Sequence, residues 1–396
     1  MKKNLSYAIV TPNTISKSRT GGVIARLLSR SDLELVGAQI FTPDESFVRE
    51  YAESIRSQEA RNLNTAGGLL ADYIERNLAP SGGRPHRMLL LIFRGDDACV
   101  KLSQICGPIF PKTKPFDQPN GETIRDTYGD LIRDPDDPEK IVYFEPAVLT
   151  PRLQELAHEN LALFVRHFQN SENIVHTMIY PDPSRVEQTL VIIKPDNWNY
   201  ASGRPGTIID MFSRTGLRIV GIKIFCFSLN QAMDFYGPVE SALMQKLAPM
   251  FGQKAKELLE REFAFHLTSE AAKTVSDCFG RGYAENQFLR IVEFMSGRRP
   301  ETCPPGEADV QGKVKCMILI YEGVDSVKKI RDVLGPTDPL KAPGGTVRRE
   351  FGSNIMVNTA HASDSVESCE REKKIVRIHE NSLIKIIEEY LAEKDQ

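Results

Sequence analysis

Paired cysteines, long apolar runs and an excess of charge are all missing from this sequence of 396 residues. Its seven cysteines are scattered with no C-x-x-C spacing, which favours a reduced, cytoplasmic protein over a disulfide scaffold or a zinc site. No apolar run approaches the roughly 18 residues that span a bilayer, so we expect no membrane partner. The net charge of −3 gives no global attraction to nucleic acid, and we expect no nucleic-acid partner either.

The amino terminus also lacks the pattern of a signal peptide. Two lysines precede only a short apolar stretch, which meets Thr11-Pro12-Asn13 without a small-residue cleavage site. We therefore expect these first residues to form a strand.

The chain repeats one pattern of apolar runs and turns. Residues 33–41 (LELVGAQIF) match residues 217–225 (LRIVGIKIF), and residues 88–95 (MLLLIFRG) match residues 316–323 (CMILIYEG). A register kept over this length predicts two copies of one domain, which we call copy one and copy two.

Each copy reads as strand, helix, strand, helices, strand and helices. Helical segments between short β-rich runs predict an α+β domain with βαββαβ connectivity. We expect copy one to span residues 1–170 and copy two to span residues 186–396, with a proline-containing join near Tyr180. Copy two carries an additional, mostly helical insertion at about residues 240–285.

His361 is the candidate for chemistry in copy two. Small residues surround it in the run 358–365 (NTAHASDS), which suits a ring that a substrate reaches. Residues 364–367 (DSVE) predict the start of a charged helix immediately after it, with Ser363 or Asp364 as the cap. Taken alone, a single histidine is more often a surface or core imidazole without chemistry.

Several residues of copy two suit a triphosphate. Lys194 ends a strand before a proline, Arg331 lies on a short predicted helix, and Arg348 follows a Gly-Gly-Thr turn. Guanidinium groups match phosphate oxygens, and Thr337 adds a hydroxyl donor. The run of cations at 328–331 also fits a solvated helix face.

Together, these motifs make copy two resemble a nucleoside diphosphate kinase. The matching motifs are residues 193–196 (IKPD), 234–237 (DFYG), 288–297 (FLRIVEFMSG), 327–339 (VKKIRDVLGPTDP), 345–351 (GTVRREF) and 358–372 (NTAHASDSVESCERE). The resemblance implies two tandem ferredoxin-like domains of the nucleoside diphosphate kinase type. It also implies transfer of the γ-phosphate of a nucleoside triphosphate to a nucleoside diphosphate.

The resemblance assigns a role to each motif residue. His361 corresponds to the nucleophile that becomes a phosphohistidine in a ping-pong reaction, Glu372 to the carboxylate that orients it, and Ser363 to a supporting hydroxyl. The nucleotide-binding positions correspond to Lys194, Tyr236, Phe288, Arg331, Thr337, Arg348 and Asn358. Among these, the cations and Thr337 hold the phosphates, Asn358 and Lys194 contact the ribose side, Phe288 stacks on the base, and Tyr236 lines the pocket.

Three of these residues also have an ordinary structural explanation that involves no nucleotide. Phe288 lies in an amphipathic run that also fits core packing, Tyr236 fits ordinary helix packing, and Glu372 fits an exposed helix charge. Two departures from the family pattern concern residues near the site. Ala362 stands where glycine is usual, which would slow catalysis if that glycine supplies backbone freedom, and Pro336 replaces a small residue.

The resemblance also implies partners and a cofactor. Nucleoside di- and triphosphates are the expected ligands, with Mg²⁺ carried on their phosphates. No group of acidic and histidine residues has ligand spacing, so we expect no metal held by the protein. Because the family assembles through repeated dimers, the two copies are expected to form an internal pseudo-dimer. Homo-oligomers of the whole chain are also consistent with the resemblance.

Copy one lacks the chemistry. Thr11, Ser103 and Ile109 stand at the positions of Lys194, Arg331 and Thr337, Arg125 alone keeps the charge of Arg348, and the segment aligned with His361 has no histidine. We therefore predict a degenerate domain that serves copy two as a partner. Two alternatives to the kinase remain: a nucleotide-binding regulatory scaffold with weak or no turnover, and a phosphohistidine relay to another protein.

Overall fold

The computed structural model describes residues 3–61, 63, 65–110 and 121–394. It divides into two compact units. The main unit comprises residues up to 224, residues 317–373 and residues from 377 onward, and the hairpin unit comprises residues 225–316 and 374–376. Both predicted sheets lie essentially within the main unit, whereas the predicted insertion falls in the hairpin unit.

The two sheets have the same strand order. In copy one, β1 (Asn4–Val10), β2 (Glu34–Phe41), β3 (Met88–Gly95) and β6 (Val148–Leu149) form the sheet β2-β3-β1-β6. In copy two, β7 (Val186–Ile193), β8 (Arg218–Phe225), β9 (Cys316–Val324) and β10 (Ala360–Ala362) form the sheet β8-β9-β7-β10. The predicted α+β fold of two tandem ferredoxin-like domains is therefore confirmed.

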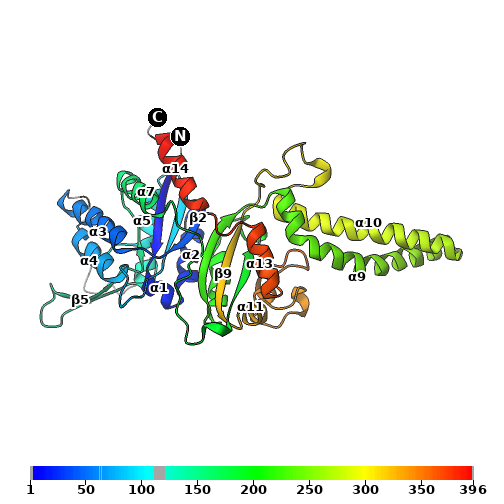
Figure 1. Cartoon of the computed structure of the whole chain (residues 1–396), viewed down its shortest axis with the longest axis horizontal. Helices are drawn as coiled ribbons and strands as arrows, with labels where there is room; N and C mark the ends of the chain where they lie inside the picture. The colour runs from blue at the N-terminus through cyan, green and yellow to red at the C-terminus, as the bar shows by residue number, and fades with distance from the viewer. Residues whose placement is uncertain (1–2, 62, 64, 111–120, 395–396) are drawn as a thin grey trace. The chain divides into compact units, whose positions relative to one another are not determined.

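Helices connect the strands of both copies in the same way (Figure 1). Those of copy one are α1 (Pro12–Ser16), α2 (Thr20–Ser29), α3 (Glu45–Ala60), α4 (Gly67–Asn77), α5 (Ala98–Cys106), α6 (Ile124–Tyr128) and α7 (Gln154–Phe168), with a small extra sheet of β4 (Asp130–Arg133) and β5 (Ile141–Glu145). Those that follow in copy two are α8 (Arg204–Ser213), α9 (Leu229–Phe263), α10 (Ser269–Ser296), α11 (Ser326–Leu334), α12 (Val347–Phe351), α13 (Val366–Ile375) and α14 (Ser382–Lys394). No described helix is both long enough and apolar enough to cross a membrane.

The alternation of side chains along the strands builds two cores. In β1, Ala8 and Val10 face one core and Tyr7 and Ile9 face the other, because successive side chains of a strand point to opposite faces. The first core continues without a break into copy two, through Val191 and other residues of its sheet and helices. The two copies therefore share one hydrophobic core.

Two glycines allow the helices that join the copies to approach each other. Helix α2 of copy one packs against its counterpart α8 of copy two. A Cβ atom on Gly206 would lie 2.3 Å from the Gly21 carbonyl oxygen and 2.3 Å from the Ala25 nitrogen. Only glycine tolerates such contact between two backbones.

The last helix of the chain packs on the first copy. Leu383, Ile384, Ile387 and Tyr390 of α14 belong to the second core, which otherwise consists of copy-one residues. Helix α14 lies against α7 and β2 (Figure 1), and the Gln154 amide donates a hydrogen bond to the Tyr390 hydroxyl at 3.2 Å. Copy one therefore draws part of its core from the last helix of copy two.

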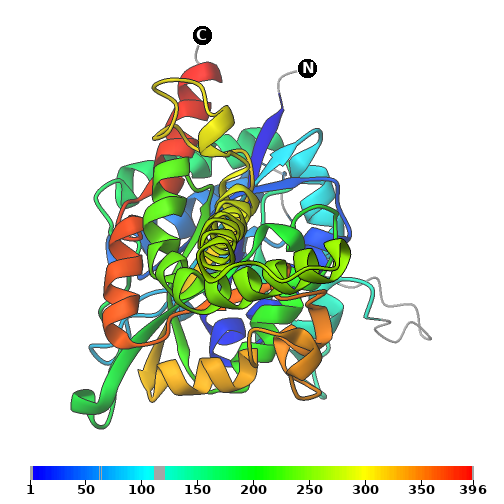
Figure 2. The ribbon, with the colours of Figure 1, turned by 90° about the vertical axis from the view of Figure 1, so that its right-hand side faces the viewer.

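The hairpin unit is an enlarged version of a feature that both copies possess. Helices α3 and α4, of 16 and 11 residues, connect β2 to β3, and α9 and α10, of 35 and 28 residues, connect β8 to β9. Helices α9 and α10 run side by side in both views (Figure 1, Figure 2). The Phe251 and Tyr283 rings stack between them at 3.9 Å. The predicted insertion is thus the far part of a long helical hairpin.

Gly206→Ala is expected to lower the free energy of unfolding by about 1–3 kcal/mol, because the new methyl group forces two backbones apart. Urea denaturation of the full chain measures this difference. Gly282→Ala provides a matched control, since a Cβ on this helical glycine meets no atom within 4 Å. Equal stability of the two variants would contradict the close packing of α2 against α8.

Candidate functional site

His361 lies on the edge strand of the copy-two sheet. Strand β10 pairs antiparallel with β7, which sets His361 opposite Ile192. Thr359, two residues earlier, is buried and has φ of 76°, a left-handed conformation that a β-branched residue rarely adopts. Strain of this kind is common at functional sites, and here it turns the chain into β10 immediately before His361.

A chain of hydrogen bonds fixes the His361 ring. The ring nitrogen Nε2 lies 3.1 Å from Glu372 Oε1, and the Ser363 hydroxyl donates to Glu372 Oε2 at 2.6 Å. Glu372 comes from α13 and is 3% exposed, so the reading of it as an exposed helix charge is wrong. With Nε2–H donated to the carboxylate, Nδ1 carries the lone pair that can act as a nucleophile.

Helix α13 begins one residue later than the sequence suggested. The residue that caps α13 is Ser365 rather than Ser363 or Asp364. The Ser365 hydroxyl accepts a hydrogen bond from the Ser368 N–H at 3.1 Å. This leaves Ser363 free to extend the strand, where its N–H donates to the Leu190 carbonyl at 3.0 Å. The Ser363 hydroxyl therefore points to Glu372 and not to a helix end.

Lys194 and Asn358 form the buried polar centre of the site. The Lys194 ammonium donates to Asn358 Oδ1 at 2.7 Å, and the Asn358 amide donates to the carbonyls of Thr337 at 3.1 Å and Ile355 at 2.7 Å. Burial lowers the pKa of Lys194 to about 7, and the nearby Arg348 guanidinium contributes to the decrease. An arriving anion would favour the charged form of this lysine.

Arg348 connects the site to the loop after α11. Its guanidinium donates to the carbonyls of Gly335 and Ala360, each at 3.0 Å. The second bond holds the residue beside His361. Arg348, a predicted phosphate-binding cation, therefore lies close to the nucleophile, and its hydrogen bonds also hold two loops in place.

Arg331 and Thr337 lie nearer the protein surface than the buried Lys194. Arg331 is half exposed and forms an ion pair with Asp364, a partner that the sequence did not reveal. Thr337 is exposed, and its carbonyl rather than its hydroxyl is bound within the protein. Phosphate contact through Arg331 would have to compete with Asp364.

The predicted base-stacking role of Phe288 does not hold in this structure. Its ring is 1% exposed, which leaves no face for a nucleobase, and Tyr236 is 4% exposed. Both residues belong to the hairpin unit. The amphipathic run around Phe288 favoured the core-packing reading, and Ala284, Phe288, Val292 and Met295 are indeed buried at helical spacing along α10.

Sequence reasoning missed Asn197, which follows the IKPD motif directly. It is buried and donates to the carbonyls of Lys194 at 3.0 Å and Thr359 at 2.8 Å. The side chain thereby ties the end of β7 to the strained residue before β10. Its place beside a motif that ends a strand was the available signal.

Copy one has the same backbone arrangement at the corresponding place but different side chains. The Thr11 N–H donates to Ala147 as the Lys194 N–H donates to Thr359, and Ala147 also has a positive φ, of 61°. Leu149 therefore stands at the register position of His361. No nucleophile is present at that place.

A buried carboxylate occupies the region where copy two has its lysine. Glu145 is 3% exposed and accepts hydrogen bonds from the hydroxyls of Thr11 at 2.8 Å and Tyr73 at 2.7 Å. An acidic group in this position repels a polyphosphate.

One group of potential metal ligands occurs among the described residues, where the sequence had predicted none. Ligand atoms of Glu172, His176 and His379 lie within 4.8 Å of one another. The sequence could not reveal it because the two histidines come from segments far apart in the chain. All three side chains are exposed and lie outside the elements that carry His361.

Comparison with known proteins identifies the family. A family model described as nucleoside diphosphate kinase matches residues 187–255 and 308–381. A nucleoside diphosphate kinase of Anaeromyxobacter dehalogenans is 30% identical over 187 residues, which cover 47% of this chain and 86% of that protein. The chain belongs to the nucleoside diphosphate kinase family.

Other members of the family match over a similar length. A nucleoside diphosphate kinase of Chlamydia pneumoniae is 29% identical over 183 residues, which cover 46% of this chain and 85% of that protein. The solved structure of the Aquifex aeolicus nucleoside diphosphate kinase has 26% identity and a TM-score of 0.29, and covers 48% of this chain and 94% of its own. The family model falls in copy two, which holds His361.

The lowered pKa of Lys194 predicts a pH dependence of stability. Between about pH 7 and the ordinary lysine pKa of 10.5, the unfolded state binds a proton that the folded state does not. The stability of the wild type relative to Lys194→Met should therefore rise with pH in this window, by at most about 1.4 kcal/mol per pH unit. Urea denaturation of both proteins from pH 7 to 10 measures it, and a difference that is flat or falls with pH would disprove the assignment.

Proposed function

We propose that copy two is a nucleoside diphosphate kinase that works through a phosphohistidine at His361. The observation that carries the proposal is the hydrogen-bonded chain from His361 through Glu372 to Ser363. It leaves Nδ1 as the attacking nitrogen of an oriented imidazole, in a segment that the family model matches. Membership of the family supports this activity.

The proposed reaction has two matched halves. Nδ1 attacks the γ-phosphorus of a nucleoside triphosphate, an N–P bond forms, and the bond to the bridging oxygen breaks, so that its electron pair leaves with the nucleoside diphosphate. Glu372 stabilises the positive charge that develops on the imidazole. A second nucleoside diphosphate then attacks the phosphohistidine through a terminal oxygen and restores the ring.

The cations of the site offset the charge that spreads over the transferred phosphoryl group. Lys194 and Arg348 are proposed to act on it directly, with Thr337 and Asn358 on the nucleotide and Arg331 after exchange of its Asp364 partner. Mg²⁺ is proposed to arrive with the substrate. Three described carboxylates next to the site support this, because Glu372 is engaged at both oxygens, Asp364 is paired with Arg331 and Asp196 is paired with Arg204.

Copy one is proposed to be a non-catalytic partner, with the two copies forming an internal pseudo-dimer. The domain assignments are residues 1–170 for the degenerate domain and 186–396 for the catalytic domain. Leu149 in place of the nucleophile, the buried Glu145 and the shared core support this division of roles. The helical hairpin at 240–285 enlarges copy two.

Incubation with γ-labelled ATP tests the proposed nucleophile. The wild type is expected to carry an acid-labile, alkali-stable label that GDP removes, whereas His361→Ala should carry none and keep the circular dichroism of the wild type. His158→Ala is a matched control on α7 and should label normally. Absence of label from a folded wild type that still binds ADP would exclude the kinase and favour the regulatory scaffold.

Ala362→Gly tests whether the departure from the family pattern slows the reaction. Ala362 lies in β10 opposite Val191 and takes no positive φ, so the backbone places no demand for glycine there. We expect turnover within about threefold of the wild type and a loss of stability of about 0.5–1 kcal/mol from the flexible glycine. A tenfold faster variant in a coupled steady-state assay would show that the alanine limits the reaction.

A further inference from the structure

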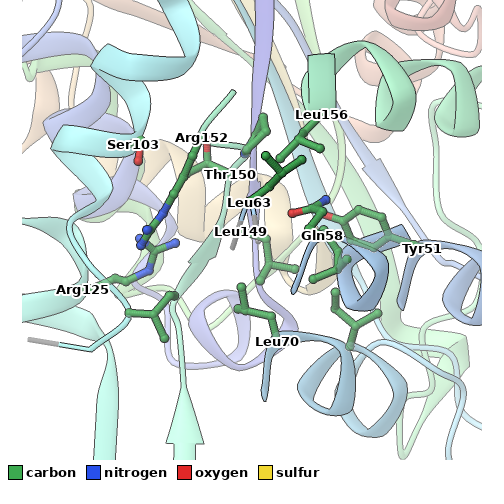
Figure 3. A pocket seen from close by; sticks show the side chains of 14 residues that line it. Tyr51, Gln58, Leu63, Leu70, Ser103, Arg125, Leu149, Thr150, Arg152 and Leu156 are labelled. Carbon is green, nitrogen blue, oxygen red and sulfur yellow. The ribbon is translucent and has the colours of Figure 1, made fainter. Parts of the chain in front are cut away.

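The pocket of copy one that corresponds to the kinase site is filled by its own side chains. Leu149 stands there at the register position of His361, and Tyr51, Leu70 and Leu156 lie around it (Figure 3). The free volume of about 20 Å³ is room for about one water. This pocket therefore has no room for a larger ligand.

Three side chains on the surface of the main unit have the composition of a metal site. Glu172 and His176 lie in the segment between α7 and β7, and His379 lies in the connection between α13 and α14. Each offers one ligand atom, and the three atoms lie within 4.8 Å of one another. All three residues belong to the main unit.

The distances between the ligand atoms approach those around a bound zinc ion. Glu172 Oε2 lies 3.5 Å from His176 Nε2 and 3.7 Å from His379 Nδ1. Two ligands at the usual zinc bond length of about 2.0–2.1 Å and a tetrahedral angle lie about 3.4 Å apart. One carboxylate oxygen therefore has an imidazole nitrogen on two sides, each at nearly the spacing that a tetrahedral ion requires.

Hydrogen bonds between the two segments hold the ligands in this arrangement. The N–H of Asn173, directly after the glutamate, donates to the His379 carbonyl at 3.3 Å. The Asn381 amide donates to the carbonyls of Phe168 at 2.7 Å and Ser171 at 2.9 Å. The two segments are therefore positioned relative to each other before an ion binds, which reduces the cost of ordering them on binding.

Strand β8 anchors the remaining ligand. The Val175 N–H donates to the Val220 carbonyl at 2.9 Å, and Val175 is buried in the first core. His176 follows directly, and its side chain is 61% exposed. Its ring can therefore rotate to close the remaining distance to His379 while the backbone stays in place.

The donor set selects among divalent ions. Two imidazole nitrogens and one carboxylate oxygen suit zinc and the neighbouring transition metals, whereas Mg²⁺ and Ca²⁺ are bound through oxygen ligands. Three protein ligands leave one position of a four-coordinate zinc ion for water. The site therefore favours zinc over the Mg²⁺ that accompanies nucleotides.

We propose that Glu172, His176 and His379 bind one Zn²⁺ ion. The ion links the segment that joins the two copies to the segment that leads into α14. Because α14 supplies part of the second core, the bound ion stabilises the attachment of this helix to copy one. This function is separate from the kinase activity proposed for copy two.

Calorimetric titration of the metal-free, untagged full chain with zinc chloride tests the proposal. We expect one zinc ion to bind per chain with saturation. A large excess of Mg²⁺ should leave the zinc affinity unchanged, because it does not replace zinc on imidazole ligands.

His176→Ala, His379→Ala and Glu172→Gln should each weaken zinc binding by about tenfold or more, since even the loss of a group that only supports a metal ligand costs about 10–100-fold. All three side chains are more than half exposed, so the variants should fold.

Two other histidines provide controls. His266→Ala is a matched control, because His266 is exposed beside a glutamate but has no second histidine in its group. His361→Ala removes the histidine of the proposed kinase site. Both variants should bind zinc as the wild type does.

Urea denaturation tests whether the ion links the two segments. Zinc should raise the urea midpoint of the wild type and of His266→Ala, because a ligand of the folded chain stabilises it. His379→Ala should show no such rise. Zinc binding to the wild type without a higher midpoint would contradict the stabilising role.

Three results of the titrations would overturn the proposal. They are an absence of saturable zinc binding to the wild type, displacement of zinc by Mg²⁺, and unchanged affinity in the three ligand variants. Weakening by His361→Ala instead of His176→Ala would place the ion in copy two and overturn it as well. None of these outcomes depends on kinase activity.

Discussion

The contact between α2 and α8 is the constraint on which the main unit depends. Gly21 and Gly206 bring two backbones together where any side chain would separate them, and the apolar residues on either side then merge into one core. Because the two helices are counterparts, each copy uses the same face toward the other. A duplicated sequence therefore produces one packed core, although only copy two carries His361.

The comparison between copies shows one backbone architecture that carries different side chains. The left-handed residue before the edge strand, the arginine bound to two carbonyls and the strand pairing are present in both copies. The side chains differ at two central positions: Lys194 of copy two corresponds to Thr11 of copy one, and His361 corresponds to Leu149. Arg125, the counterpart of Arg348, holds the loop after α5 and β6 together through its hydrogen bonds.

Much of the fold followed from the sequence, because a repeated register and alternating apolar residues specify sheet order and faces through local chemistry. The link between His361 and Glu372 also followed, since both lie in one continuous motif. Long-range outcomes did not follow. The pairing of Arg331 with Asp364, the complete burial of Phe288 and the position of α14 each depend on which distant segment arrives beside them. Asn197 was missed because buried asparagines that tie loops have no spacing rule.

The position of α14 has a consequence for how the protein is made. A ribosome releases copy one first, yet the second core of copy one is complete only after Leu383, Ile384 and Ile387 have been synthesised. Until then the part of the sheet at β2 that receives α14 stays uncovered, and exposed apolar surface favours association with other chains. The first half of the chain thus lacks part of its own core throughout synthesis of the second. The two halves could not be separated into independent genes by a cut between them without leaving one of them short of its own core.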